Sequence, residues 1–211
     1  MWFGLLGPFL GTAVGAGAVL GMPMESRRWN AALAGAAGGA MIAACIWNLL
    51  LPALEAGRGW ALAGFVFGMA ALLLPGRLPG REYSPAASLL LAVVLHNIPE
   101  GMAVGAGDSA GLTLGIAMQN IPDGAVAAVP LLALGVSRRR AFLAGILTGA
   151  VEPLAAALMM AFSAVLIPWM PFLLGFAAGA MLFVVLTELS AGMGESGWGM
   201  LSFALGFVLM I

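Results

Sequence analysis

The chain has 211 residues, of which 63% are hydrophobic and only 8% are charged, and its formal net charge at pH 7 is -1. A soluble domain carries roughly a quarter charged residues, so this composition excludes an ordinary soluble fold and indicates an integral membrane protein. The near-zero net charge gives no footprint for nucleic-acid binding. The single cysteine, Cys45, excludes an internal disulfide and a CxxC-type zinc or redox site.

Eight apolar stretches follow one another along the chain, each near the roughly 20 residues that a helix needs to cross a bilayer. They cover residues 3–22, 30–54, 60–74, 86–107, 112–136, 141–166, 170–189 and 197–211. The third and eighth are short, and the eighth looks clipped at Ile211. Because the intervening loops are too short to hold a soluble domain, we predict one all-α transmembrane domain of eight helices over residues 1–211.

The arginines predict the orientation of these helices. All eight basic residues are arginines, and seven of them lie in the loops after the first, third and fifth stretches. The seven are Arg27, Arg28, Arg77, Arg81, Arg138, Arg139 and Arg140, and the exception is Arg58. By the positive-inside rule these loops are cytoplasmic, so both termini are expected outside.

Four carboxylates fall inside the apolar stretches: Glu100, Asp123, Glu152 and Glu188. An ionisable group at the bilayer centre costs about 2.5 kcal/mol or more, and such a group usually faces a cavity or a partner. Since the chain has no lysine and its arginines lie in loops, a cation from outside the chain is the natural partner. Glu188, near the end of the seventh stretch, can equally be an interfacial carboxylate that reaches water.

The fourth stretch contains the chain's only histidine, in the motif HNIPEG at 96–101. His96 and Glu100 are four residues apart, so both project from one helix face, with Asn97 beside them. Pro99 removes a helical hydrogen bond, is expected to kink the helix, and leaves the carbonyl of Leu95 without its usual donor. Pro and Gly interruptions of membrane helices indicate binding sites.

The fifth stretch repeats the motif 23 residues later as QNIPDG at 119–124. Gln119 and Asp123 repeat the pair spaced by four residues, and Asn120 takes the place of Asn97. Consecutive spans with a short connection run antiparallel, so the two similar half-sites are expected to meet near the middle of the membrane. The alternative is a pair of kinked packing helices whose polar groups only bond one another.

Two further spans offer ligands. Glu152 directly precedes Pro153 in the sixth span, and its alternative role is that of a protonated, hydrogen-bonded carboxylic acid. Met41, Cys45 and Asn48 share one face of the second span, where soft sulfur would suit zinc, cadmium or copper(I). A methionine on a helix face is more often packing material.

One imidazole, several carboxylates and side-chain amides form a mixed ligand set. Imidazole suits zinc, iron, nickel and copper, whereas magnesium and calcium prefer oxygen cages, so we favour a divalent transition metal. A structural zinc site would be closed by about four Cys or His ligands. The weaker set here suits a site that must release its ion, so the metal is expected to be a transported substrate and not a cofactor.

The chain resembles the ZIP family of zinc and iron transporters, in particular its bacterial GufA-type branch, over essentially its whole length. The resemblance rests on the doubled NIP motif, EP at 152–153, GTAVGA in the first stretch, AAGGAMIAACIWNLLLPALE in the second and GFAAGAMLFVVLTEL in the seventh. It implies an inverted repeat in which spans 1–3 are related to spans 6–8 around the central spans 4 and 5.

The same resemblance implies uptake of zinc, or of cadmium, iron or manganese, into the cytoplasm across the bacterial cytoplasmic membrane. It implies elevator-like alternating access and a possible homodimer. The metal is expected at a binuclear or dual-position site between spans 4 and 5. The implied ligands are His96, Asn97, Glu100, Gln119, Asn120, Asp123 and Glu152, with Met41 and Asn48 at or near the site.

Two alternatives belong to other classes of protein. A passive metal channel would use the same weak ligands. An intramembrane serine hydrolase is suggested by GDSAG at 107–111, which matches G-x-S-x-G but lies in a short loop and lacks the strand-turn-helix context of that motif. A metalloprotease would need H-E-x-x-H, which a single histidine cannot supply.

Overall fold

The computed structural model describes residues 2–21, 27–73, 85–107, 110–133, 135–194 and 197–210. This described part contains helices and no strand, which confirms the predicted all-α class. The elements are α1 (Trp2–Ala16), α2 (Ala18–Gly21), α3 (Arg27–Ala44), η1 (Cys45–Leu50), α4 (Leu51–Leu73), α5 (Pro85–Ala106), α6 (Ala110–Ala133), α7 (Arg138–Gly149), α8 (Val151–Ala161), α9 (Ser163–Leu166), η3 (Ile167–Trp169), α10 (Met170–Val184), η4 (Val185–Leu189), α11 (Ser190–Met193) and α12 (Gly197–Leu209).

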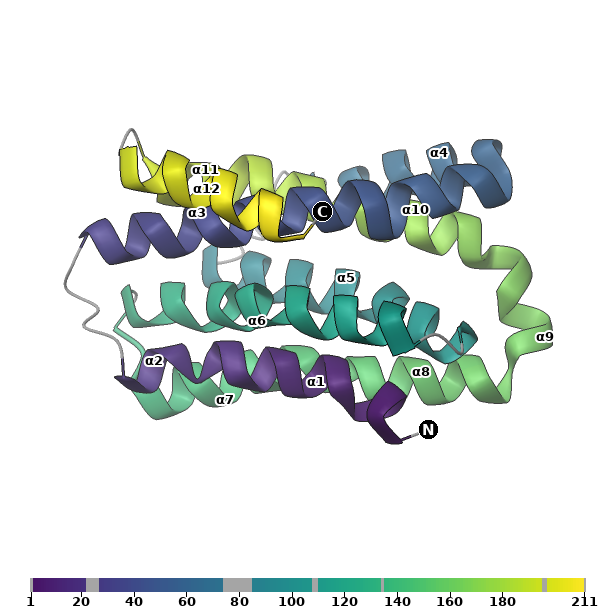
Figure 1. Cartoon of the computed structure of the whole chain (residues 1–211), viewed down its shortest axis with the longest axis horizontal. Helices are drawn as coiled ribbons and strands as arrows, with labels where there is room; N and C mark the ends of the chain where they lie inside the picture. The colour runs from purple at the N-terminus through teal and green to yellow at the C-terminus, as the bar shows by residue number, and fades with distance from the viewer. Residues whose placement is uncertain are drawn as a thin grey trace, which may run out of the picture.

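The helices cover the predicted stretches but divide several of them differently. The second and third stretches are joined into one helical run, which is interrupted at Gly57, where φ is 177° and ψ is 90°; the chain turns back near this point (Figure 1). The sixth stretch is divided among α7, α8 and α9. Pro153, which has no N–H to donate to the carbonyl of Gly149, lies in the first turn of α8, just after the break at Ala150.

The apolar helices fit a membrane environment. Three helices of the described chain are long and apolar enough to cross a membrane: Arg28–Leu73, Arg138–Ala161 and Ser163–Thr187. Leu5–Gly21 and Gly197–Leu209 are shorter apolar helices. The outer surface carries many large exposed apolar side chains, among them Leu147 and Leu209, as is expected of helices that face lipid. The protein is therefore a helical membrane protein.

The helices form two layers (Figure 1). One layer, which we call the site bundle, consists of α1, α2, α5, α6, α7 and α8. The other, the second bundle, consists of α3, η1, α4, α10, η4, α11 and α12. A hydrophobic core extends from one bundle into the other, because it contains Leu49 and Ala178 of the second bundle together with Val93 of α5 and Ala127 of α6.

Within each bundle, helices pack in parallel pairs through glycines. Gly11 of α1 faces the backbone carbonyl of Ala117 in α6, and one turn later Gly15 faces that of Ile121, so both chains advance in the same direction. The pairs α5 with α8, α3 with α12 and α4 with α10 repeat this arrangement, through Gly101 and Gly105, Gly35 and Gly39, and Gly175 and Gly179. Small residues allow such close backbone approach between membrane helices. These contacts set the spacing of the helices around the site.

We expect Gly179→Ala to lower the free energy of unfolding by about 1–3 kcal/mol, because the added methyl group would overlap the backbone of Phe65 in α4. The matched control is Gly115→Ala in α6, where an added Cβ meets nothing within 4 Å. Thermal unfolding of the purified protein in detergent would compare them. Equal melting temperatures for the two variants would contradict this packing.

Candidate metal centre

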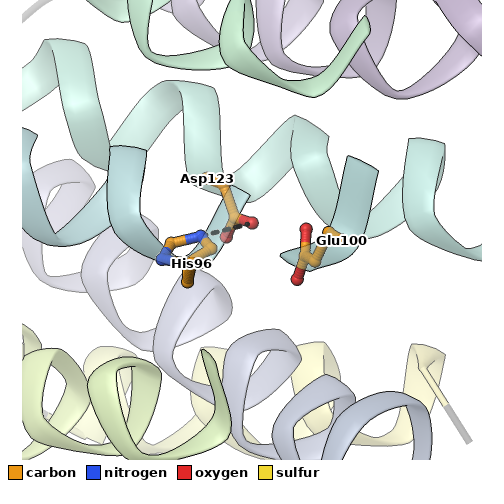
Figure 2. A group of neighbouring side chains, drawn as sticks. All are labelled: His96, Glu100 and Asp123. Atoms are coloured by element: carbon orange, nitrogen blue, oxygen red, sulfur yellow. Dashed lines mark ion pairs between the residues drawn. The ribbon is translucent and has the colours of Figure 1, made fainter. Parts of the chain in front are cut away.

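His96, Glu100 and Asp123 meet at the middle of the site bundle (Figure 2). His96 and Glu100 lie one helical turn apart on α5, and Asp123 approaches from α6. One ligand atom of each residue lies within 4.8 Å of those of the other two, and His96 Nε2 lies 3.4 Å from Asp123 Oδ2. Ligand bonds to zinc are about 2.0–2.2 Å long, so ligands on opposite sides of the ion are at most about 4.4 Å apart. A small contraction would bring the three onto one metal ion.

These carboxylates are buried without a basic partner other than His96. Glu100 and Asp123 are 0% and 1% exposed. The arginine side chains that the structure describes, among them Arg58 and Arg138, are all exposed. Burying a charge is costly unless it is paired or coordinates a metal. The charge balance of this cluster therefore favours a bound cation.

Several buried oxygens of the cluster lack a hydrogen-bond donor within the described chain. They are Glu100 Oε2, Asp123 Oδ1, Asn97 Oδ1 and Asn120 Oδ1. Buried polar groups are nearly always satisfied, so each exception needs an explanation. All four atoms are acceptors, so each would be satisfied by a donor or a cation from outside the described chain.

The amide side chains are oriented by their NH2 groups. Asn97 Nδ2 donates to the carbonyl of Thr148 at 3.0 Å. Gln119 Nε2 donates to Glu100 Oε1 at 2.5 Å, and Gln119 Oε1 accepts from Asn48 Nδ2 at 2.8 Å. The hydrogen bonds from Asn48 to Gln119 and from Gln119 to Glu100 therefore link η1 of the second bundle to the carboxylate cluster.

Glu152 lies outside the group of three. It is 1% exposed, and both of its carboxylate oxygens accept hydrogen bonds. Thr12 Oγ1 donates to Oε1 at 3.1 Å, and Asn120 Nδ2 donates to Oε2 at 2.7 Å. Gly101 of α5 packs against the backbone of Glu152, which holds α8 against the helix that carries His96 and Glu100. Glu152 is thus adjacent to the cluster and already bonded by neutral donors.

Three residues were expected to share a face of the second span. Met41 and Cys45 both belong to the hydrophobic core, where Cys45 Sγ lies 3.3 Å from the carbonyl of Ala178, while Asn48 bonds Gln119. A π-helix over Cys45–Leu50 lies between Met41 and Asn48. Its i→i+5 hydrogen bonds change the residue spacing from that of an α-helix.

Some predicted features fall outside the described residues. They are the side chain of Glu188, whose backbone lies in η4, residues 108–109 of the GDSAG motif, and Arg77 and Arg81 of the orientation prediction. The structure in turn adds Thr12 and the carbonyl of Thr148 to the surroundings of the site. Thr12 is the only hydroxyl residue of α1, and a lone polar side chain in an apolar span is a sequence signal that could have pointed to it. No sequence signal pointed to the carbonyl of Thr148.

The apolar helical bundle, with an imidazole, buried carboxylates and amide oxygens at its centre, describes a helical membrane protein with a candidate cation site. A family model described as "ZIP Zinc transporter" matches residues 78–211. The chain belongs to this family of transporters, which are not enzymes, and this sets aside the hydrolase alternative. The predicted resemblance, including that to bacterial members, is confirmed.

Three relatives illustrate the match. The chain is 46% identical over 149 residues to "Zinc transporter ZIP11" of Bos taurus, covering 63% of this chain and 43% of that protein. It is 36% identical over 120 residues to "Zinc transporter GufA" of Myxococcus xanthus, covering 52% and 46%. It is 34% identical over 216 residues to "Zinc transporter ZIPB" of Bordetella bronchiseptica, covering 85% and 68%. The matches thus span less than half of the first two relatives.

We expect Glu100→Gln to weaken binding of zinc or cadmium at least tenfold, because the amide keeps the shape of the side chain but removes the charge that attracts the ion. A tenfold loss corresponds to about 1.4 kcal/mol. Isothermal titration of the purified full chain in detergent would measure it. Glu55→Gln, at an exposed carboxylate of α4, is the control and should bind as the wild type does; a similar loss in both variants would rule out Glu100 as a specific ligand.

Proposed function

We propose that the chain is a carrier that moves a divalent transition metal, zinc in the first place, into the cytoplasm through the site between α5 and α6. The observation that carries the proposal is the buried cluster of His96, Glu100 and Asp123 with its unpaired oxygens. We include Asn97, Gln119, Asn120, Glu152, Met41 and Asn48 as ligands or as residues at or near the site. The relatives named above as zinc transporters support the choice of zinc.

The ligand chemistry supports transport over permanent binding. A closed structural zinc site has about four Cys or His ligands. Here one imidazole is accompanied by carboxylates and by neutral amides, which also bond other protein groups. Cadmium, iron and manganese fit the same donor set and are proposed as alternative substrates.

We also propose eight membrane crossings arranged as an inverted repeat. Two internal correspondences support it: GAM occurs at 39–41 and at 179–181, and each copy is followed by a π-helix, Cys45–Leu50 and Val185–Leu189. Both correspondences have an offset of 140 residues, which relates spans 1–3 to spans 6–8. The four parallel helix pairs also agree with eight spans of alternating direction.

Alternating access by movement of one bundle against the other is the mechanism we propose. The ligands of the cluster all come from the site bundle, so the ion would move with it. The core that joins the bundles is rich in small side chains such as Ala127, Ala177 and Ala178, and a smooth interface of this kind suits sliding. The bond from Asn48 to Gln119 crosses the interface and would break during the movement.

The orientation and assembly are proposed on different grounds. The arginine distribution supports cytoplasmic loops after spans 1, 3 and 5, with both termini outside. A location in the bacterial cytoplasmic membrane and a homodimeric assembly rest on the similarity to bacterial members of the family.

In reconstituted vesicles we expect His96→Ala and Glu100→Ala each to abolish most zinc or cadmium uptake, because each removes a ligand from a cluster with no spare charge. A fluorescent metal indicator inside the vesicles would report the rate, and Glu55→Gln would serve as the control. Uptake at the wild-type rate in both alanine variants would refute the proposed site.

A carrier and a channel differ in how flux depends on concentration. We expect uptake to saturate at low metal concentration, since each ion must bind and be carried across by a conformational change. Planar bilayer recordings would be the complementary measurement. Unitary currents at the very high rate of an open pore would replace the carrier proposal by the channel alternative.

A further inference from the structure

Thr12 is a buried hydroxyl beside the metal centre, and the ligand set proposed above does not include it. It is 0% exposed, in the middle of α1. Its Oγ1 lies 3.1 Å from Glu152 Oε1 and 3.5 Å from the carbonyl of Pro8, one turn earlier in its own helix. The shorter contact reaches the carboxyl group on another helix, whereas the longer one is well beyond the usual O–H···O distance.

Two glycines fix the position of Thr12. An added Cβ at Gly149, at the end of α7, would lie 2.7 Å from Thr12 Cβ and 2.9 Å from Thr12 Oγ1. An added Cβ at Gly124, in α6, would overlap the backbone carbonyl of Thr12. Close contact with both neighbouring helices therefore leaves the hydroxyl little freedom to turn away from Glu152.

The internal repeat relates Thr12 to Glu152. The two positions differ by 140 residues, the offset that also relates the GAM segments and the π-helices. Gly124 packs on the carbonyl of Thr12, and Gly101, its counterpart in the other NIP motif, packs on the carbonyl of Glu152. The two halves thus place a hydroxyl and a carboxylate at corresponding positions, close enough to bond each other.

We infer that Thr12 is a positioning residue for the transported ion and that it acts through Glu152. Its hydroxyl donates to one carboxylate oxygen while Asn120 donates to the other, which fixes the plane of the carboxylate next to the cluster. Each oxygen of a carboxylate keeps a further lone pair for a metal ion. The inference rests on the proposed function, since it assigns Glu152 a part in holding the ion.

The test compares cadmium binding by Thr12→Val, Thr12→Ser and wild-type full-length protein, measured by isothermal titration in detergent. Valine keeps the branched shape and removes the hydroxyl, so binding should weaken about 10- to 100-fold, as for the loss of other hydrogen-bond partners of metal ligands. Serine keeps the hydroxyl and should bind close to the wild-type level. Thr113→Val, at another buried threonine, 6% exposed in α6, should also leave binding unchanged.

A double-mutant cycle separates positioning from a general structural effect. In a Glu152→Gln background, Thr12→Val should cause no further loss, because its route to the ion is already removed. An equal loss in both backgrounds, or an equal loss in Thr113→Val, would overturn the inference.

Two further results complete the test. If Thr12→Val does not fold, Gly149→Ala pushes against the Thr12 side chain from the opposite helix and should weaken cadmium binding in the same way; unchanged binding there would overturn the inference. Wild-type protein that binds no cadmium would overturn the proposed function as well. Wild-type binding together with unchanged binding by Thr12→Val would overturn this inference alone.

Discussion

The organisation of this protein depends on three carboxylates buried in an apolar bundle with one histidine and no nearby lysine or arginine among the described residues. Glu100 and Asp123 share the cluster with His96, and Glu152 lies beside it. Each charge would be expensive to bury alone. Neutral donors satisfy part of the set, since Gln119 bonds Glu100 while Thr12 and Asn120 bond Glu152. Several of the oxygens left over are acceptors without a donor in the described chain, which supports the proposed binding of a cation.

The rest of the fold places these groups and keeps them together. Glycines let α1 approach α6 and let α5 approach α8 until backbone meets backbone. Such spacing brings side chains from four helices within hydrogen-bonding distance in a small volume. The core between the two bundles is also rich in small side chains such as Ala127 and Ala178, which supports the proposed movement of one bundle against the other. The bond from Asn48 to Gln119 crosses between the bundles and would break in that proposed movement.

The proline motifs have different structural outcomes, although they look alike in sequence. Pro99 and Pro122 lie within helices α5 and α6, which continue through them, whereas the helix is interrupted before Pro153. Because proline removes the same hydrogen bond in each case, the packing around each proline decides whether its helix continues. At Gly149 the adjacent Thr12 side chain occupies the space that a larger residue would need. The interruption there places Glu152 in the first turn of α8, facing α1 and α6.

The sequence by itself determined the helical membrane class, the approximate limits of the helices and the residues of the cluster, because apolar length and intramembrane charge are local properties. His96 with Glu100 follows from helical spacing, and Asp123 follows from the repeated motif. Only the tertiary structure decided that Glu152 bonds Thr12 and Asn120, and that Met41 lies in the apolar core while Asn48 reaches Gln119. These outcomes depend on which helices become neighbours and on a π-helix within the second span. The spacing of residues along one helix predicts neither the neighbouring helices nor the position of the π-helix.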